Sequence, residues 1–127
     1  MDWNSPFILW SIVSSLRRKD VNNMFMGLFN HKDINSGVNE WRNTKGAILL
    51  DVRTAEEYRE YHIDGSMNIP LGSLDSIVQI INDRSTPLFV HCLSGGRSAR
   101  AAAFLKGKGY TDVHDIGGIS AYKGETV

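Results

Sequence analysis

The clearest features of the chain are two almost uninterrupted apolar runs, at residues 47–52 and 88–90. Runs of this kind are typical of strands that are covered on both faces, as in a parallel sheet. Shorter apolar stretches near residues 67–69 and 112–116 predict two further strands. Apolar spacing and helix-forming residues predict helices in the segments 36–41, 54–61, 73–81 and 97–107. We therefore expect an α/β domain with a central, mostly parallel sheet of about five strands and helices on both faces.

One helix start carries a specific signal. Thr54 is followed three residues later by Glu57, the pattern of a capping box in which each side chain bonds the backbone N–H of the other residue. Less specific candidates for the N-caps of two other helices are Asn35 or Ser36 and Ser73 or Asp75. The Thr54 signal predicts a helix directly after the first long apolar run.

The first thirty residues follow a different pattern. An apolar cluster at residues 7–16 precedes three basic residues, and residues 21–29 carry apolar side chains at helical spacing. The cluster is shorter than the roughly 20 apolar residues that cross a bilayer. Its positive charge follows it, whereas a secretory signal carries positive charge in front. We therefore expect an apolar, amphipathic helical extension at residues 1–32, one domain at residues 33–127, and a cytoplasmic protein.

Two roles for residues 1–30 stay open. Their helices cover part of the domain or are partly disordered, or else they dock to a membrane surface or to another protein chain. The residue pattern alone does not separate these roles.

Composition narrows the class of partner. The 127 residues suit one domain, and 42% hydrophobic with 22% charged residues is close to the average of folded globular proteins. The formal net charge is zero at pH 7, which argues against nucleic acid as a main partner. The chain has one cysteine and no cluster with metal-ligand spacing. We therefore expect no internal disulfide, no metal and no other cofactor.

The single cysteine, Cys92, stands where the apolar run at 88–90 turns into an Ala-rich helix. In open α/β folds the carboxyl end of a strand lies at the edge of the sheet where ligands bind. Gly95 and Gly96 allow a tight turn whose N–H groups point inward, and the helix N-terminus adds partial positive charge. These surroundings favour a reactive thiolate. The residues of the turn after Cys92 are Leu93, Ser94, Gly95, Gly96, Arg97 and Ser98.

Five motifs in order resemble the single-domain members of the rhodanese family of sulfurtransferases. They are LLDVRTAEEY at 49–58, HIDGSMNIP at 62–70, CLSGGRS at 92–98, GYTDV at 109–113 and GGISAY at 117–122. The resemblance covers the chain from about residue 33 to its end. It implies a rhodanese-like fold and an enzyme that moves sulfane sulfur through a persulfide on Cys92. The implied donors are thiosulfate, a polysulfide or a thiol persulfide, and the implied acceptor is a thiol or cyanide.

The resemblance also implies a role for each site residue. Cys92 is the nucleophile, and the turn at residues 93–98 binds the donor, with backbone N–H groups stabilising the outer sulfur as an oxyanion hole does. Arg97 either holds an anionic donor, or only reaches solvent or braces Asp51 or Glu56 within the fold. Asp51 and Arg53, in the Asp-Val-Arg motif, are expected to support the site rather than to react.

Two positions depart from the members of the family that prefer thiosulfate. The larger, two-domain rhodaneses place basic residues where this chain has Glu57 and Ser94. The site therefore offers fewer cations to a dianion, and we expect thiosulfate to be a poor donor. Tyr61 stands where the family usually has Gly, which changes the rim of the site.

Two other functions stay open. The first is the chemistry of a phosphatase or an arsenate reductase. Protein tyrosine phosphatases and the related cell-cycle phosphatases carry five residues between Cys and Arg, one more than the four that separate Cys92 from Arg97. The smaller ring fits one sulfur atom better than a tetrahedral phosphate or arsenate. Rhodanese-like domains also serve as non-catalytic binding or regulatory modules. An intact Cys92 followed by both glycines argues against such a degenerate copy.

Overall fold

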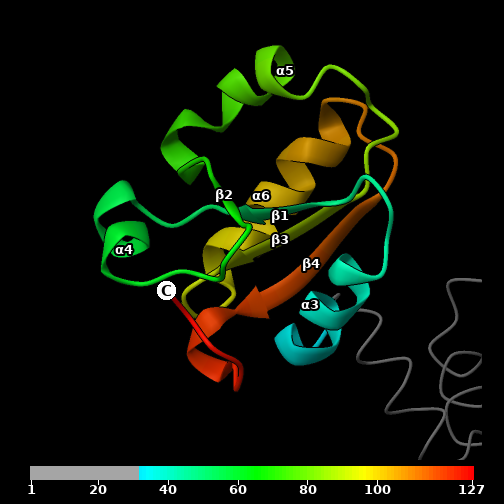
Figure 1. Cartoon of the computed structure of the whole chain (residues 1–127). Helices are drawn as coiled ribbons and strands as arrows, with labels where there is room; N and C mark the ends of the chain where they lie inside the picture. The colour runs from blue at the N-terminus through cyan, green and yellow to red at the C-terminus, as the bar shows by residue number, and fades with distance from the viewer. Residues whose placement is uncertain (1–31) are drawn as a thin grey trace, which may run out of the picture. The chain divides into compact units, whose positions relative to one another are not determined.

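The computed structural model describes residues 32–127, which alternate between strands and helices (Figure 1). The predicted extension at residues 1–32 lies outside the described residues, apart from Lys32, and stays a prediction. In chain order, with η denoting a 3-10 helix, the elements are α3 (Ile34–Arg42), β1 (Ile48–Asp51), α4 (Ala55–Glu60), β2 (Met67–Asn68), η1 (Leu71–Ser76), α5 (Ile77–Ile80), β3 (Leu88–Cys92), α6 (Gly96–Gly107), β4 (Val113–Gly118) and η2 (Ile119–Ala121).

The strands form one parallel sheet in the order β2-β1-β3-β4. The predicted α/β class and parallel sheet are confirmed, although residues 32–127 contribute four strands where about five were expected. The two long apolar runs supply the central pair, β1 and β3, in which Asp51 lies beside His91. At the outer edge of β4, the Lys32 N–H donates a hydrogen bond of 3.1 Å to the carbonyl oxygen of Asp115.

The sheet separates two hydrophobic clusters. Side chains alternate along a strand, so Leu49 and Phe89 face one side while Leu50 and Val90 face the other. The cluster on the α3 side includes Ile34, Val38, Leu49, Ile63, Phe89, Ile116 and Ile119. The cluster on the α6 side includes Leu50, Leu74, Ile77, Val90, Cys92, Ala101 and Leu105. Figure 1 shows α3 and α6 on opposite sides of the sheet, which confirms helices on both faces.

The capping box predicted at Thr54 and Glu57 is present at the start of α4. Thr54 Oγ1 accepts the Glu57 N–H at 3.2 Å, and Glu57 Oε1 accepts the Thr54 N–H at 3.0 Å. Both partners thereby satisfy N–H groups that the first turn of a helix leaves without a partner. The Glu57 side chain is therefore held in place by the Thr54 backbone N–H, shortly after the end of β1.

The other two predictions of helix N-caps were wrong. The N-cap of α3 is Asp33, whose carboxylate accepts the Asn35 N–H, while the Asn35 side chain bonds the distant Ala121 carbonyl. The helix expected at 73–81 is a 3-10 helix, η1, that runs into the single turn α5, and neither start has a side-chain cap. The Leu71 N–H donates to the Val52 carbonyl, which ties the entry of η1 to the end of β1.

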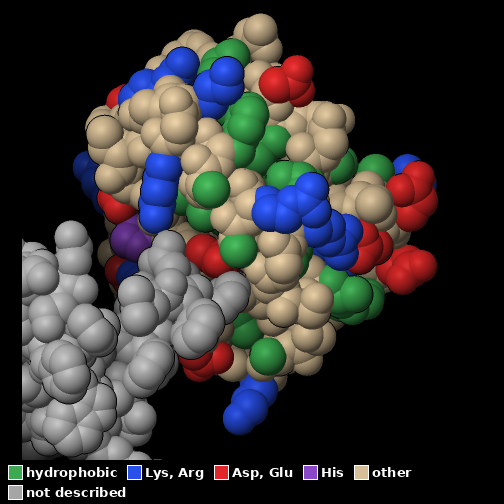
Figure 2. All heavy atoms as spheres, turned by 180° about the vertical axis from the view of Figure 1, so that it is seen from behind, with side chains coloured by type: hydrophobic (Ala, Val, Ile, Leu, Met, Phe, Trp, Pro, Cys, Tyr) green, Lys and Arg blue, Asp and Glu red, His purple; other side chains and the backbone are tan. Residues whose placement is uncertain are grey.

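The surface of the described residues is mixed in charge. Figure 2 shows basic and acidic side chains scattered among polar and apolar ones on one face, rather than a field of one sign. None of the helices in residues 32–127 is long and apolar enough to cross a membrane. A mixed surface agrees with the formal net charge of zero.

Candidate active site

The site is built at the carboxyl end of β3. Cys92 is the last residue of this strand, and α6 begins at Gly96. The chain turns between them through Gly95, whose φ of 109° lies in the left-handed region that favours glycine. The Cys92 side chain is 1% exposed and belongs to the hydrophobic cluster on the α6 side. The turn thus places one free thiol at the edge of the sheet, beside a helix N-terminus.

A backbone donor of the turn is directed at the sulfur. The Gly95 N–H donates to Cys92 Sγ at 3.0 Å. The position of Gly95 is fixed by the buried Ser98 hydroxyl, which donates to the Gly95 carbonyl at 3.0 Å and to the Gly117 carbonyl at 3.3 Å. An N–H donor fixed at this distance stabilises negative charge on sulfur. Ser98 therefore acts as a support for the turn.

The start of the turn is packed against the end of β4. The Ser120 N–H donates to the Leu93 carbonyl at 3.0 Å. A Cβ at Gly118 would collide with that same Leu93 carbonyl and would lie 2.6 Å from the Cα of Ser94. Gly118 has an ordinary extended φ of −123°, so the need for glycine here comes from space. From the sequence, Gly118 is recognisable only as part of the motif at 117–122, because its contact with residue 93 arises from the pairing of β3 with β4.

Gly118→Ala is expected to destabilise the domain by about 1–3 kcal/mol, because the backbone of the turn must move to admit the methyl group. The measurement is urea unfolding of the variant against the wild type. Gly72→Ala is the matched control, since a Cβ at Gly72 meets nothing within 4 Å. Equal stability of the two variants would contradict the close packing of β4 against the turn.

Arg97, in the first turn of α6, forms a bidentate ion pair with Glu57 of α4. Its Nη1 and Nη2 donate to the two carboxylate oxygens at 2.6 Å and 2.9 Å. The hydrogen bonds from Arg97, opposed by burial and assisted by those with Thr54, lower the pKa of Glu57 to about 2. The same bonds raise the pKa of Arg97 against the effect of burial. Arg97 therefore braces Glu57, and the prediction that it would brace Asp51 or Glu56 was wrong, because the starts of α4 and α6 lie side by side.

Asp51 and Arg53 form a second, fully buried ion pair below the site. The Arg53 guanidinium donates to Asp51 from Nε at 3.0 Å and 3.1 Å and from Nη2 at 2.8 Å. Nη2 also donates to the Tyr61 carbonyl at 2.8 Å, which ties the end of β1 to the segment after α4. Burial lowers the pKa of Arg53, but the bonds and the attraction to Asp51 outweigh it, so the net shift is upward. Asp51 also accepts the Arg53 backbone N–H at 3.0 Å, so the pair is tied to the backbone at both ends.

His91 lies on the opposite face of β3 from Cys92. Its Nδ1 is 3.1 Å from the Cys92 carbonyl oxygen, and its Nε2 is 3.6 Å from Asp51 Oδ2. Burial lowers the pKa of His91, and the nearby Asp51 only partly offsets this effect. Within residues 32–127, Nε2 has no hydrogen-bond partner. His91 is therefore a buried ring between the Asp51 carboxylate and the Cys92 backbone.

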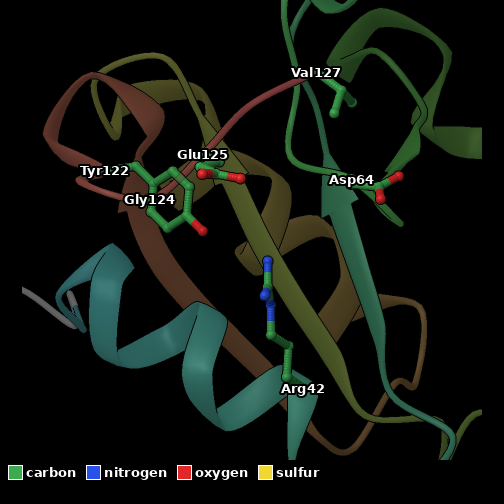
Figure 3. A pocket seen from close by; sticks show the side chains of 6 residues that line it. All are labelled: Arg42, Asp64, Tyr122, Gly124, Glu125 and Val127. Atoms are coloured by element: carbon green, nitrogen blue, oxygen red, sulfur yellow. The ribbon is translucent and has the colours of Figure 1, made fainter.

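A separate pocket of about 390 Å³ lies beside the end of α3. Its lining residues are Arg42, Asp64, Tyr122, Gly124, Glu125 and Val127. Figure 3 shows the Arg42 side chain extending from α3 into this space, between Asp64 on one side and Tyr122 on the other. Neither Cys92 nor its turn lines the pocket. Among residues 32–127, no group of three or more His, Cys, Asp or Glu side chains is placed to hold a metal ion.

This architecture and the motif match define the class of protein. The profile of the rhodanese-like domain matches residues 35–125, and the chain belongs to that family. A solved structure described as a rhodanese with anions from E. coli superposes with a TM-score of 0.59 at 32% identity, covering 64% of this chain and 96% of that one. The rhodanese-like domain of the Alr3790 protein from Anabaena gives a TM-score of 0.68 over 77% of this chain and 78% of that one; at 22% identity it supports the fold alone.

Curated relatives narrow the class of enzyme. Thiosulfate sulfurtransferase PspE of Escherichia coli is 35% identical over 71 residues, which are 55% of this chain and 68% of that protein. Thiosulfate sulfurtransferase GlpE of Pseudomonas savastanoi is 35% identical over 88 residues, 65% of this chain and 82% of that protein. Similarity to several such enzymes confirms the predicted class, a sulfurtransferase of the rhodanese type.

Proposed function

We propose that the protein transfers sulfane sulfur through a persulfide carried on Cys92. The observation that supports this most directly is the Gly95 N–H, 3.0 Å from Cys92 Sγ at the start of α6. A fixed backbone donor at the sulfur favours the thiolate that must attack, and the same turn suits the negative outer sulfur of a persulfide. The donor is a small sulfur compound, either thiosulfate, which the names of the relatives suggest, or a polysulfide or thiol persulfide. The acceptor is a thiol or cyanide.

The chemistry is a pair of displacements at sulfur. The Cys92 thiolate attacks the outer sulfur of the donor, and the S–S bond of the donor breaks, its electron pair leaving with sulfite or with a thiolate. The outer sulfur is now bonded to Cys92. An acceptor thiolate or cyanide then attacks that sulfur, and the electron pair of the new S–S bond returns to Cys92 Sγ. The cycle needs no oxidant, and because the chain has one cysteine, the acceptor must be a separate molecule.

Supporting residues are assigned on their contacts. Ser98 holds the carbonyl of Gly95, and Gly118 leaves room for the start of the turn. Asp51 and Arg53 fix the end of β1 beside β3 from a buried position. None of these residues forms or breaks a bond in the proposed reaction. They position the turn around Cys92, whose Sγ is the reacting atom.

The intact mass of the protein tests this proposal. After incubation with thiosulfate or with a small-thiol persulfide and removal of the donor, the protein is expected to gain the mass of one sulfur atom. Cyanide should remove that mass and release thiocyanate in equal amount. A protein that gains no sulfur from either donor, while it remains folded, would overturn the proposal and would favour a binding module instead.

A glycine inserted between Gly96 and Arg97 is expected to slow sulfur transfer about a hundredfold, because it lengthens the turn that directs the Gly95 N–H at Cys92 Sγ. The rate of persulfide formation is the measurement, with hydrolysis of a phosphate ester followed in parallel. A glycine inserted between Lys45 and Gly46, in an exposed turn, is the control. If the enlarged turn transfers sulfur at the wild-type rate, ring size does not select for sulfur.

A further inference from the structure

The guanidinium of Arg97, at the start of α6, already forms an ion pair with Glu57. Both ends of the Arg97 guanidinium donate to the Glu57 carboxylate, at 2.6 Å and 2.9 Å, and both side chains are about one-third exposed or less, at 32% and 26%. A fork-to-fork pair of this kind uses the geometry by which arginine otherwise recognises a carboxylate or another oxyanion. An anionic ligand at Arg97 must displace Glu57 or accept its negative charge as a neighbour.

Glu57 is not a side chain that swings aside at little cost. Its Oε1 also accepts the Thr54 N–H at 3.0 Å, and its own N–H donates to Thr54 Oγ1 at 3.2 Å. Moving the carboxylate away from Arg97 would therefore break the capping box that begins α4. With a pKa lowered to about 2, chiefly by Arg97, the carboxylate stays charged at neutral pH. Glu57 is therefore a negative charge that Thr54 and Arg97 hold in one place.

This anion lies beside the turn that carries Cys92. Cys92 ends β3, and Arg97, the partner of Glu57, follows it by five residues in the first turn of α6. A donor whose sulfur reaches Cys92 Sγ enters the same strand-to-helix turn, and we expect the rest of its atoms to lie near this pair. For thiosulfate those atoms include an anionic sulfonate group, which would compete with Glu57 for the same donors.

We propose that Glu57 is a specificity-determining residue that excludes dianionic donors by occupying Arg97, so that the preferred donor is the persulfide of a small thiol. This proposal rests on the proposed sulfur transfer through Cys92. In the favoured step the Cys92 thiolate attacks the outer sulfur of a protonated persulfide, RS–SH. The RS–S bond breaks, RS⁻ leaves with its electron pair, and Cys92 carries the S–SH group. One negative charge enters the step and one leaves, and the site never binds a dianion.

Glu57→Gln tests the proposal. The glutamine amide oxygen still accepts the Thr54 N–H, since Gln is the alternative residue of a capping box, so α4 should be retained. Arg97 loses its charged partner and becomes available to an anion. The kcat/KM for thiosulfate is expected to rise about tenfold or more, the effect of one charge-assisted hydrogen bond, and mainly through a lower KM. The kcat/KM for the persulfide of 2-mercaptoethanol should change less than about twofold.

Glu56→Gln is the matched control. It removes the same charge one residue away, but Glu56 is 75% exposed and its ion pair with Arg59, at 3.6 Å, lies on the surface. Neither donor should respond to it, because surface charges of this kind act weakly. The double variant Glu57→Gln/Arg97→Gln should return thiosulfate use to within about threefold of the wild type, since the gain depends on a freed Arg97.

Three results would overturn the proposal. They are a wild-type kcat/KM that already favours thiosulfate, a Glu57→Gln variant that improves both donors equally, and a gain that survives in the double variant. Thermal unfolding of each variant confirms that it is folded under the assay conditions. Failure of the proposed function itself looks different, because then the wild type would gain no sulfur on Cys92 from either donor.

Discussion

Replacing Cys92 with serine is expected to abolish sulfur loading and to lower the rate of transfer by at least about a thousandfold, down to the background rate. The hydroxyl is a far weaker nucleophile than the thiolate, and the chain has no second thiol that could take over. The fold should survive, because serine is nearly the same size and its oxygen can accept the Gly95 N–H in place of Sγ. Intact mass after incubation with donor and the steady-state rate are the measurements.

Cys92→Ala provides the second variant for this experiment. It removes the hydroxyl as well and should be equally inactive, so any slow reaction of the serine oxygen is recognised by comparison. Sulfur transfer at the wild-type rate by either folded variant would show that Cys92 does not carry the sulfur.

Arg53→Met is expected to destabilise the domain by about 3–5 kcal/mol, since it leaves the Asp51 carboxylate buried without its cation. Asp51 and Arg53 are 0% and 1% exposed, so water cannot replace the lost partner. A loss of this size is a large share of the stability of an ordinary domain. Urea unfolding gives the free energy, with the linear dependence on denaturant checked for both proteins.

The double variant Asp51→Asn/Arg53→Met separates the buried charge from the loss of packing. The amide introduced at position 51 would keep an oxygen for the backbone N–H of residue 53, which Asp51 Oδ1 now accepts at 3.0 Å. No charge would remain buried, so the double variant should recover part of the lost stability. A double variant less stable than Arg53→Met alone would mean that the ion pair is not the source of the effect.

Much of the sheet was predictable because its signals are local. The apolar runs that became β1 and β3 are nearly continuous, and only strands covered on both faces require that pattern. The capping box at Thr54 is a four-residue signal that needs no tertiary contact. The 3-10 helix at 71–76 was not predictable in this way, because the Leu71 N–H bonds the Val52 carbonyl and fixes the entry of the segment from outside. The N-cap of α3 was a different case: Asp33 caps the helix through a local bond to the Asn35 N–H, so this signal was present in the sequence and was missed.

The turn around the Cys92 thiol was predictable from the order of residues along the chain, whereas the side chain that pairs with Arg97 was not. Cys92, Gly95 and Gly96 lie within five residues, and the strand and helix on either side place them at the sheet edge. The pairing of Arg97 with Glu57 depends on β1 and β3 being neighbours, which brings the starts of α4 and α6 together. Sequence spacing left Arg97 with two roles, and only this adjacency shows which acidic side chain it braces.

The burial of Cys92 limits how readily reagents reach its sulfur. With 1% of the residue exposed, an alkylating reagent is expected to react only when a local opening of the structure exposes the sulfur. Because the chain has no other thiol, the rate of alkylation relative to that of a small free thiol would report the fraction of time that Cys92 is accessible, without labels or mutations.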